Sequence, residues 1–502
     1  MKHTRLLCGL LAMLLCLVCF AACAKPDDTP TDVETEEDET QGGNATHDEN
    51  GYELDSLPET LDFGNTEVNM LAWFATLDEF CFTDEIGVGV IAEAQYNQLD
   101  RVEDRLNIDI TFNQIAGREE DKDTYLQEIE NSNLSGDPYD LVSAYSGIGA
   151  MAAMRGLFQN LSTQNYIDFQ KPWWPQDLQN SVAIEGNLFF ASGDISPNVI
   201  YGLFSIIANM DLWENYYGST LGNTYLYDLV DQKKWTLETM MNLSKDIYVD
   251  LDNNGKTDSD QYGFVFSNTV SIDAFLQGSG IDVTTRDSSG KLKMADIFFG
   301  QQMIDLVDKL GDFYKWEDVA VSEAYAGIFP EGRALFMDAK IEVCITKLAD
   351  TELTYAALPV PMYDEAQKGY VTTMNHNFSV FGILTNLAAD ATDRAAATLE
   401  ALASEAYRSV SPAIFEKAFR LRYSADSDVS RMYQYVRDGL KFEMARLYRL
   451  NFPANQPTNL FRDCVRAHSS WYASVASNKG QWNRTLGTIS DALKELAEKQ
   501  KN

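Results

Sequence analysis

A run of nine residues in the middle of the chain carries oxygen-bearing side chains at a regular spacing. It reads Asp250-Leu251-Asp252-Asn253-Asn254-Gly255-Lys256-Thr257-Asp258. Oxygen side chains stand at loop positions 1, 3, 5 and 9, with glycine at position 6, which is the spacing of an EF-hand calcium loop. The predicted ligands are the side chains of Asp250, Asp252, Asn254, Asp258 and Gln261, together with the carbonyl oxygen of Lys256.

Gln261 departs from this pattern. An EF-hand loop closes at position 12 with a glutamate that binds the ion through both oxygens, and this chain has glutamine there. We therefore expect modest calcium affinity, unless Asp260 or a distant carboxylate completes the shell. The alternative is a plain turn after a helix, rich in Asn, Asp and Gly. The pattern favours a structural calcium ion over the bare turn.

The loop stands between a predicted helix, which opens at Trp235-Thr236, and a predicted strand at Gly263 to Ser267. Short apolar runs of this kind, separated by turn residues, predict buried strands. The other predicted strands are Val68 to Ala75, Tyr139 to Tyr145, Asn187 to Ser192, Phe204 to Ala208, Ala334 to Met337, Tyr355 to Val360 and Phe378 to Leu384. Helical patterns lie between them, at Gly149 to Leu157 for example, and dominate from Ala391 to a last amphipathic helix with Leu486, Ile489, Leu493 and Leu496. Strands interleaved with helices predict an α/β fold.

The N-terminus is typical of a secretion signal. Lys2 and Arg5 precede an uncharged apolar run over residues 6–22. Phe20-Ala21-Ala22-Cys23 resembles the lipobox of bacterial lipoproteins, in which the cysteine is diacylated and the preceding peptide is removed. A permanent membrane span is the alternative, but the run is near the lower length limit for one. We predict a signal peptide at 1–22 and lipid, palmitate among the acyl chains, on Cys23.

Residues 23–60 are predicted to form a disordered acidic tether. Residues 24–51 contain ten acidic residues and almost no large apolar ones, so they cannot bury enough surface to offset their ordering entropy. The whole chain has a formal net charge of -37. A surface this acidic argues against nucleic acid as a partner and against adsorption to anionic lipid. The remaining 440 or so residues suffice for two or three ordinary domains.

Six segments of the body, in this order, are similar to the family 1 extracellular solute-binding proteins of ABC importers, and to their clostridial lipoprotein branch. They are Gly186-Asn187-Leu188-Phe189-Phe190 with Gly193-Asp194, Ile207 to Trp213, Trp235 to Met240, Gln261-Tyr262-Gly263-Phe264, Ala357 to Gln367, and Val410 to Glu416. The resemblance covers essentially everything after the tether. It implies a binding protein, not an enzyme, that delivers a small polar solute, a sugar, to permease subunits from the extracytoplasmic face of the cell membrane.

The resemblance also implies a two-lobed periplasmic-binding-protein-like fold of the class II type, with the ligand in the cleft. The implied first lobe is 61–207 with a return at 355–410, and the second is 208–354 with the helical region 411–502. Crossings are expected near Ser205 to Asn209 and on either side of 355–410. Members of the family carry a similar calcium loop, far from the ligand.

Sugar pockets combine aromatic faces with carboxylates and amides. Residues of these types near the ends of predicted strands, where cleft residues lie in two-lobed proteins, are the predicted ligand contacts. They are Trp73, Tyr145, Ser146, Tyr201, Asn268, Asp273, Asp338, Asn375 and His376. For any single aromatic residue, packing in the core is the simpler interpretation.

Two other classes of function stay open at the level of sequence. A secreted glycan-active enzyme would need only a pair of carboxylates, and the chain has many. It has no HExxH, no nucleophile elbow and no phosphate loop. A surface scaffold or sensor protein is the third possibility. Stoichiometric binding without turnover separates the first class from the enzyme, and loss of solute uptake on deletion separates it from the scaffold.

Overall fold

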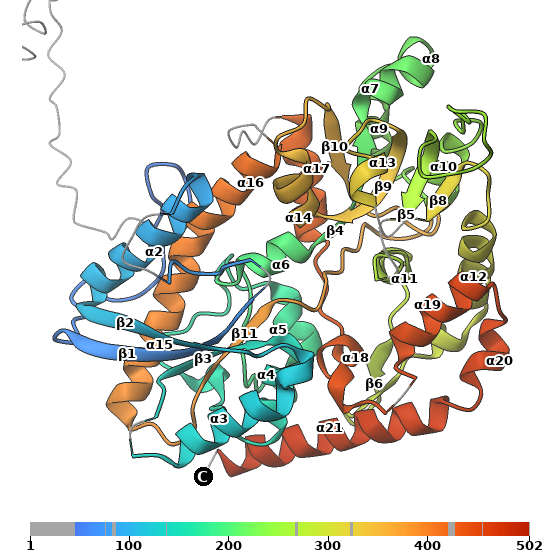
Figure 1. The fold of residues 1–502 in the computed structure, drawn as a ribbon. Helices are drawn as coiled ribbons and strands as arrows, with labels where there is room; N and C mark the ends of the chain where they lie inside the picture. The colour runs from blue at the N-terminus through green and yellow to red at the C-terminus, as the bar shows by residue number, and fades with distance from the viewer. Residues whose placement is uncertain are drawn as a thin grey trace, which may run out of the picture. The chain divides into compact units, whose positions relative to one another are not determined.

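The computed structural model describes residues 46–500, apart from 76, 83–86, 137, 267–269, 322–324, 420–426 and 454. The chain from Thr46 onward forms one compact unit (Figure 1). The predicted signal peptide, Cys23 and the first part of the predicted tether lie outside the described residues, as does Asn268. In the part of the chain that is described, no helix has the length and apolar character needed to span a bilayer.

A four-stranded sheet organises the first lobe, in the order β11-β3-β1-β2. Its strands are β1 (Thr66–Trp73), β2 (Ile108–Ile115), β3 (Leu141–Tyr145) and β11 (Ser379–Ile383). β1 pairs in parallel with β2 and β3, and β11 joins antiparallel to β3. Parallel strands need crossover helices, and these are α2 (Val90–Leu106) and α3 (Lys122–Leu134). Helix α15 (Ala389–Glu405) packs against α2, and α4 (Ser146–Met154) against α3 and β11.

A five-stranded sheet organises the second lobe, in the order β10-β4-β9-β5-β8. The strands are β4 (Phe204–Asn209), β5 (Tyr262–Phe266), β8 (Val319–Val321), β9 (Ala334–Lys340) and β10 (Tyr355–Leu358). β5 runs parallel to β8 and β9, whereas β4 is antiparallel to β9 and β10. Helices α9 (Tyr225–Asp231), α10 (Leu237–Leu243), α11 (Asp273–Gly278) and α12 (Gln301–Phe313) belong to this part of the chain. A small hairpin, β6 (Thr284–Arg286) and β7 (Leu292–Met294), extends from it.

Three segments that run between the lobes lie side by side: 191–204, 372–379 and 439–447, called here the crossing segments. Leu203 pairs with Met374, and Thr372 pairs with Leu440. The first crossing was predicted at Ser205 to Asn209, but β4 already lies in the second sheet, so the crossing comes just before it. The return to the first lobe was predicted from residue 355, but β10 pairs with β4 and stays in the second sheet. A strand of the first sheet reappears at β11, after the second crossing segment.

The C-terminal region is helical and contacts both lobes. Helix α16 (Ser411–Phe419) contacts α2 in the first lobe and the short helix at Cys344–Leu348 in the second. Helix α17 (Asp428–Asp438) packs on β10 and α9, and α19 (Pro457–Ala467) packs on α12. The last helix, α21 (Lys479–Lys499), contacts both β7 and α4, so it is not confined to the second lobe (Figure 1). Its buried face includes Leu486, Ile489 and Leu493, as its periodicity predicts.

Residues 46–60 were assigned to the disordered tether, but they lie on the first lobe. Asp55 forms an ion pair with Arg105 at 2.5 Å, and Glu53 one with Lys171 at 2.8 Å. Leu57 is buried in the core. The composition of this stretch was misleading because its acidic residues meet cations that the rest of the fold supplies.

Candidate functional site

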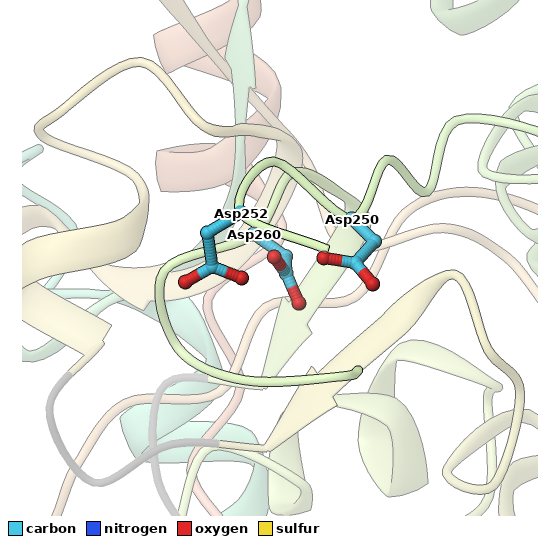
Figure 2. Close-up of side chains that lie close together, drawn as sticks. All are labelled: Asp250, Asp252 and Asp260. Atoms are coloured by element: carbon cyan, nitrogen blue, oxygen red, sulfur yellow. The ribbon is translucent and has the colours of Figure 1, made fainter. Parts of the chain in front are cut away.

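The calcium-type loop brings three carboxylates together. Asp250, Asp252 and Asp260 each place a carboxylate oxygen within 4.8 Å of the other two (Figure 2). Asp250 and Asp252 come from the turn itself, and Asp260 follows it, directly before β5. Positive φ angles at Asn253 and Gly255 let the chain reverse sharply around this point. Three converging carboxylates are the ligand type that a hard cation such as calcium prefers.

The hydrogen bonds of the loop distinguish these three residues from the other predicted ligands. The side chain of Asn254 donates to Asp252 at 2.8 Å, and the Gln261 amide donates to Tyr216 and to the Ile247 carbonyl. Asp258 is outside the cluster of three carboxylates. Asp260, named as a residue that could complete the shell, is the third member of the cluster. The strand register explains the difference, because Gln261 pairs with Val249 in a backbone bridge.

The three carboxylates differ in how far the protein satisfies them. Asp260 accepts hydrogen bonds from the backbone N–H of Thr257 and Leu251 and from the Tyr248 hydroxyl. These donors, Thr257 first, lower the pKa of Asp260. Asp250 accepts one bond, from Gly255 N–H at 3.0 Å, on one oxygen. Its other oxygen is buried and meets no hydrogen-bond donor in the described chain, so the residues present fit a cation ligated at that point.

A second cluster lies where the first lobe meets the crossing segments. The Trp73 indole N–H, at the end of β1, donates to Ser379 Oγ at 2.7 Å, and its ring meets the ring of Tyr145 edge-on at 5.4 Å. Tyr145 ends β3, and its ring in turn lies 6.1 Å from the His376 imidazole. Ser146 Oγ donates to the His376 carbonyl at 2.6 Å. The fold thus brings together four predicted contact residues from three separate segments.

Three arginines extend this cluster toward the second lobe. The Arg449 guanidinium lies over the Tyr145 ring, 5.5 Å from its centroid, and pairs with Glu119 at 2.6 Å. Arg446 donates to the Met374 carbonyl at 2.8 Å and to Asp273 at 2.5 Å. Arg462, from α19, donates to both oxygens of Asp273. Asp273 is fully buried, so two cations neutralise one carboxylate inside the protein.

The positive charges act on His376. Burial and the nearby Arg449, Arg446, Arg462 and Lys340 lower its pKa well below the usual value. The imidazole is therefore neutral near pH 7, with one ring nitrogen able to accept a hydrogen bond. Burial raises the pKa of Tyr145, so its hydroxyl stays protonated. In these states the imidazole can accept a hydrogen bond and the Tyr145 hydroxyl can donate one.

The remaining predicted contacts are more dispersed. Tyr201 is buried, and that burial raises its pKa. Asp338 is buried and accepts a hydrogen bond from Ser271 Oγ at 2.6 Å. Asn375 is half-buried, and its backbone N–H donates to the Gly202 carbonyl in the crossing segments. Trp73 is 2% exposed, so its side chain packs in the interior and supports the cluster from there.

Sequence reasoning missed Arg446, Arg449 and Arg462. They stand in a helical stretch where basic residues are common on exposed faces, and nothing in their spacing separates them from surface cations. Their burial in the folded protein distinguishes them from surface cations, since Arg449 is only 9% exposed and Arg446 only 8%. A small crevice of about 10 Å³ lies beside Arg446. Its lining also includes Ser146, Met374, His376 and Lys441, and it is called here the front crevice.

No protein-family model matches the chain, and no curated protein matches it in sequence. Its structure is similar to that of a cyclo/maltodextrin-binding protein solved with maltotetraose, with a TM-score of 0.52 at 12% identity, over 85% of this chain and 96% of that one. It is also similar to the cyclic alpha-maltosyl-1,6-maltose binding protein of Arthrobacter globiformis, with a TM-score of 0.54 at 13% identity, over 84% and 100% of the two chains. Both are binding proteins by description. At such identities the likeness establishes the fold, which is the two-lobed periplasmic-binding-protein fold.

Proposed function

We propose that this chain is the extracytoplasmic solute-binding component of an ABC importer and that it captures an oligosaccharide or a similar polar solute. The observation that carries the proposal is the position of the aromatic and arginine cluster. It lies at the carboxyl ends of β1 and β3 and against the crossing segments, where two α/β lobes meet. Ligands of open α/β sheets bind outside the carboxyl ends of the strands.

The chemistry of the cluster supports a hydroxyl-rich solute. Tyr145 and His376 offer ring faces and neutral hydrogen-bonding groups, and the arginines offer fixed donors. Sugars bind through this combination of aromatic faces and polar groups. Hinged closure of the two lobes would bury the solute between them. The two solved proteins with this fold were described with maltotetraose and as a maltosyl-maltose binding protein, which supports a saccharide as the solute.

Delivery to a permease requires that the protein stay at the membrane. The proposed anchor is the lipid on Cys23, which follows the lipobox-like residues. Two acyl chains hold a protein firmly where one does not, at about 0.8 kcal/mol per buried methylene. Cys23→Ser should release the protein into the medium or leave it unprocessed. A fully processed variant that stays on the membrane would contradict the anchor.

We further propose that the calcium-type loop holds a structural cation with Asp250, Asp252 and Asp260 as its carboxylate ligands. Its carboxylates belong to the second lobe and come from one short stretch of chain. A cation there would fix the turn between α10 and β5 and take no direct part in solute binding. The buried, unpartnered oxygen of Asp250 supports the proposal.

The function is tested by a thermal-shift screen of the purified protein against a glycan library, with oligopeptides and polyols included. A ligand that binds only the folded state stabilises it by RT ln(1 + [L]/Kd), so weak ligands register at high concentration. Each hit is then incubated with the protein, and products are sought by mass spectrometry. We expect stabilisation by a saccharide without turnover. Steady product formation would identify an enzyme. A deletion that leaves solute uptake unchanged would favour a scaffold.

A further inference from the structure

Residues of the crossing segments line two hollows of very different size. The front crevice, of about 10 Å³, includes Lys441 in its lining. A groove of about 500 Å³, called here the back groove, includes Leu440. Leu440 is bridged to Thr372 in the second crossing segment. The linings of the two hollows share no residue, so they are separate sites on the crossing segments.

Both lobes build the walls of the back groove. Trp173 and Trp174 come from a loop of the first lobe, whereas Arg437 and Asp438 end α17, which packs on the second sheet. Val199 and Leu203, in the first crossing segment, also line the groove. Arg437 spans the groove through an ion pair with buried Asp194 at 2.5 Å. Its guanidinium also lies 5.4 Å from the Tyr407 ring centroid.

A neighbouring hollow of about 220 Å³ extends the groove. It shares Pro172, Arg437 and Asp438 with the first hollow. Tyr52 and Tyr407 line it, with their rings edge-on at 5.4 Å, and both are half-buried. Small-molecule pockets typically measure about 300–1,000 Å³, so the groove is large enough for a sugar of one to a few rings.

The lining has the chemistry of a sugar site. Apolar residues of the first crossing segment form part of the surface, and the tyrosines of the neighbouring hollow offer aromatic faces. Carboxylates and amides surround them, from Glu53, Asp177, Asp438, Gln170 and Gln434. The C–H face of a sugar ring packs on aromatic or apolar side chains while its hydroxyl groups donate to carboxylate and amide oxygens. Among the described lining residues, Arg437 is the cation, and its charge is balanced by Asp194.

We propose that the back groove is a second saccharide site and that a sugar bound there favours the arrangement of the lobes in which the front crevice is closed. In this structure the groove is open and the crevice is nearly filled. A molecule that fills the groove keeps its two walls apart, so it stabilises this arrangement over one in which the groove narrows. A crevice of about 10 Å³ has no room for a sugar, so a sugar in the groove weakens solute binding at the front. Because coupling is reciprocal, a solute held at the front weakens binding in the groove by the same factor. The coupling rests on the proposed function; the groove site itself does not.

The test is isothermal titration of the whole protein with glucose, galactose, maltose, cellobiose and maltotetraose. Asp438→Trp places a bulky side chain at the rim that the two hollows share, and Gln434→Trp is a second blocking variant one turn earlier in α17. Lys417→Trp is the matched control, because Lys417 is exposed on neighbouring α16 and is not part of the lining. Arg449→Ala weakens the front site.

We expect two binding events in the wild type and in Lys417→Trp. Either blocking variant removes one event, and Arg449→Ala weakens the other. Saturating the groove should lower the affinity of the front site about fivefold or more, the lower end of typical allosteric coupling. A single event that responds to Arg449→Ala and ignores both blocking variants would overturn the groove site and leave the proposed function intact. No binding by any of these sugars would overturn the groove site, while the proposed function would still face its own wider screen.

Discussion

The calcium-type loop and the arginine cluster at the crossing segments differ in which groups surround their carboxylates. In the loop, Asp250, Asp252 and Asp260 converge, and none of the ion pairs among the described residues involves them. In the cluster, the single carboxylate of Asp273 receives two arginines. Like charges that converge repel, whereas a buried charge paired on both sides is stable only as long as every partner is present. The proposed calcium ion would supply the loop with a cation from outside, whereas the cluster contains its own cations.

Glu400 provides a third arrangement, between these two. It is 1% exposed and accepts a hydrogen bond from the Trp174 indole at 2.8 Å. Burial, the largest cause, raises its pKa to about 8. Where neither a side-chain cation nor a metal ion neutralises a carboxylate, a proton can. We therefore expect the three regions to respond to different perturbations. The arginine cluster should respond to loss of a partner, Glu400 to a change of pH, and the loop to removal of a cation.

The largest effect is expected from Asp273→Ala. The substitution leaves Arg446 and Arg462 without their shared carboxylate in a buried site, and breaking a buried ion pair in this way costs about 3–5 kcal/mol. Urea denaturation measures the loss in the free energy of unfolding. Asp296→Ala, which removes an exposed partner of Lys293, is the control and should change stability by no more than about 0.5 kcal/mol. Equal losses in the two variants would show that the cluster is no more than a surface ion pair.

A pH-dependent loss is expected from Glu400. Its folded-state pKa of about 8 lies above the ordinary value of 4.5, so between these values the folded chain binds a proton that the unfolded chain has lost. This group therefore lowers the free energy of unfolding as pH rises from 4.5 to 8, by an amount on the order of a few kcal/mol. Glu400→Gln should gain stability over the wild type at pH 8.5 relative to pH 5. The surface variant Glu130→Gln should keep the same difference from wild type at both pH values. A Glu400→Gln variant that behaves like this control would refute the raised pKa.

Arg449→Ala should reduce solute affinity about tenfold or more, since a hydrogen bond to a charged group is worth about 1.5–3 kcal/mol. The ligand is the strongest hit of the thermal-shift screen, and the dissociation constant is measured by titration calorimetry. Arg155→Ala is the matched control, because Arg155 pairs with Glu130 on the surface of the first lobe. An unchanged dissociation constant, in a variant that melts like the wild type, would remove Arg449 from the solute site.

The smallest effect is expected from removing calcium. Extracellular calcium modules bind at roughly 0.1–1 mM, so 1 mM calcium should add about 0.4–1.4 kcal/mol to the free energy of unfolding. Asp260→Asn should abolish this gain, and Asp258→Asn should keep it, because Asp258 stands outside the three converging carboxylates. This pair of variants separates the geometry of the structure from the EF-hand spacing. If chelator changes neither the wild type nor Asp258→Asn, the loop is a turn without a metal.

Only part of the geometry of the loop could be predicted from its local sequence. The proximity of the Asp250 and Asp252 carboxylates followed from their spacing, because neighbours in a tight turn remain neighbours in space. The choice of Asp260 over Asp258 and Gln261 required the register of the backbone bridge between Val249 and Gln261. The strands β1, β3, β4, β5, β9, β10 and β11 could likewise be predicted, because each contains a short apolar run that is mostly buried.

The sequence by itself determined the α/β class, the position of most strands and the carboxylate turn, since each depends on residues a few positions apart. Only the tertiary structure decided which strands share a sheet, where the chain crosses between the lobes, and that Asp273, Arg446 and Arg462 meet across 189 residues of chain. Such contacts are set by packing and by the pairing of buried charges, and a one-dimensional pattern carries no record of either. The same reason hid the back groove, whose walls come from segments that are neighbours only in the folded protein.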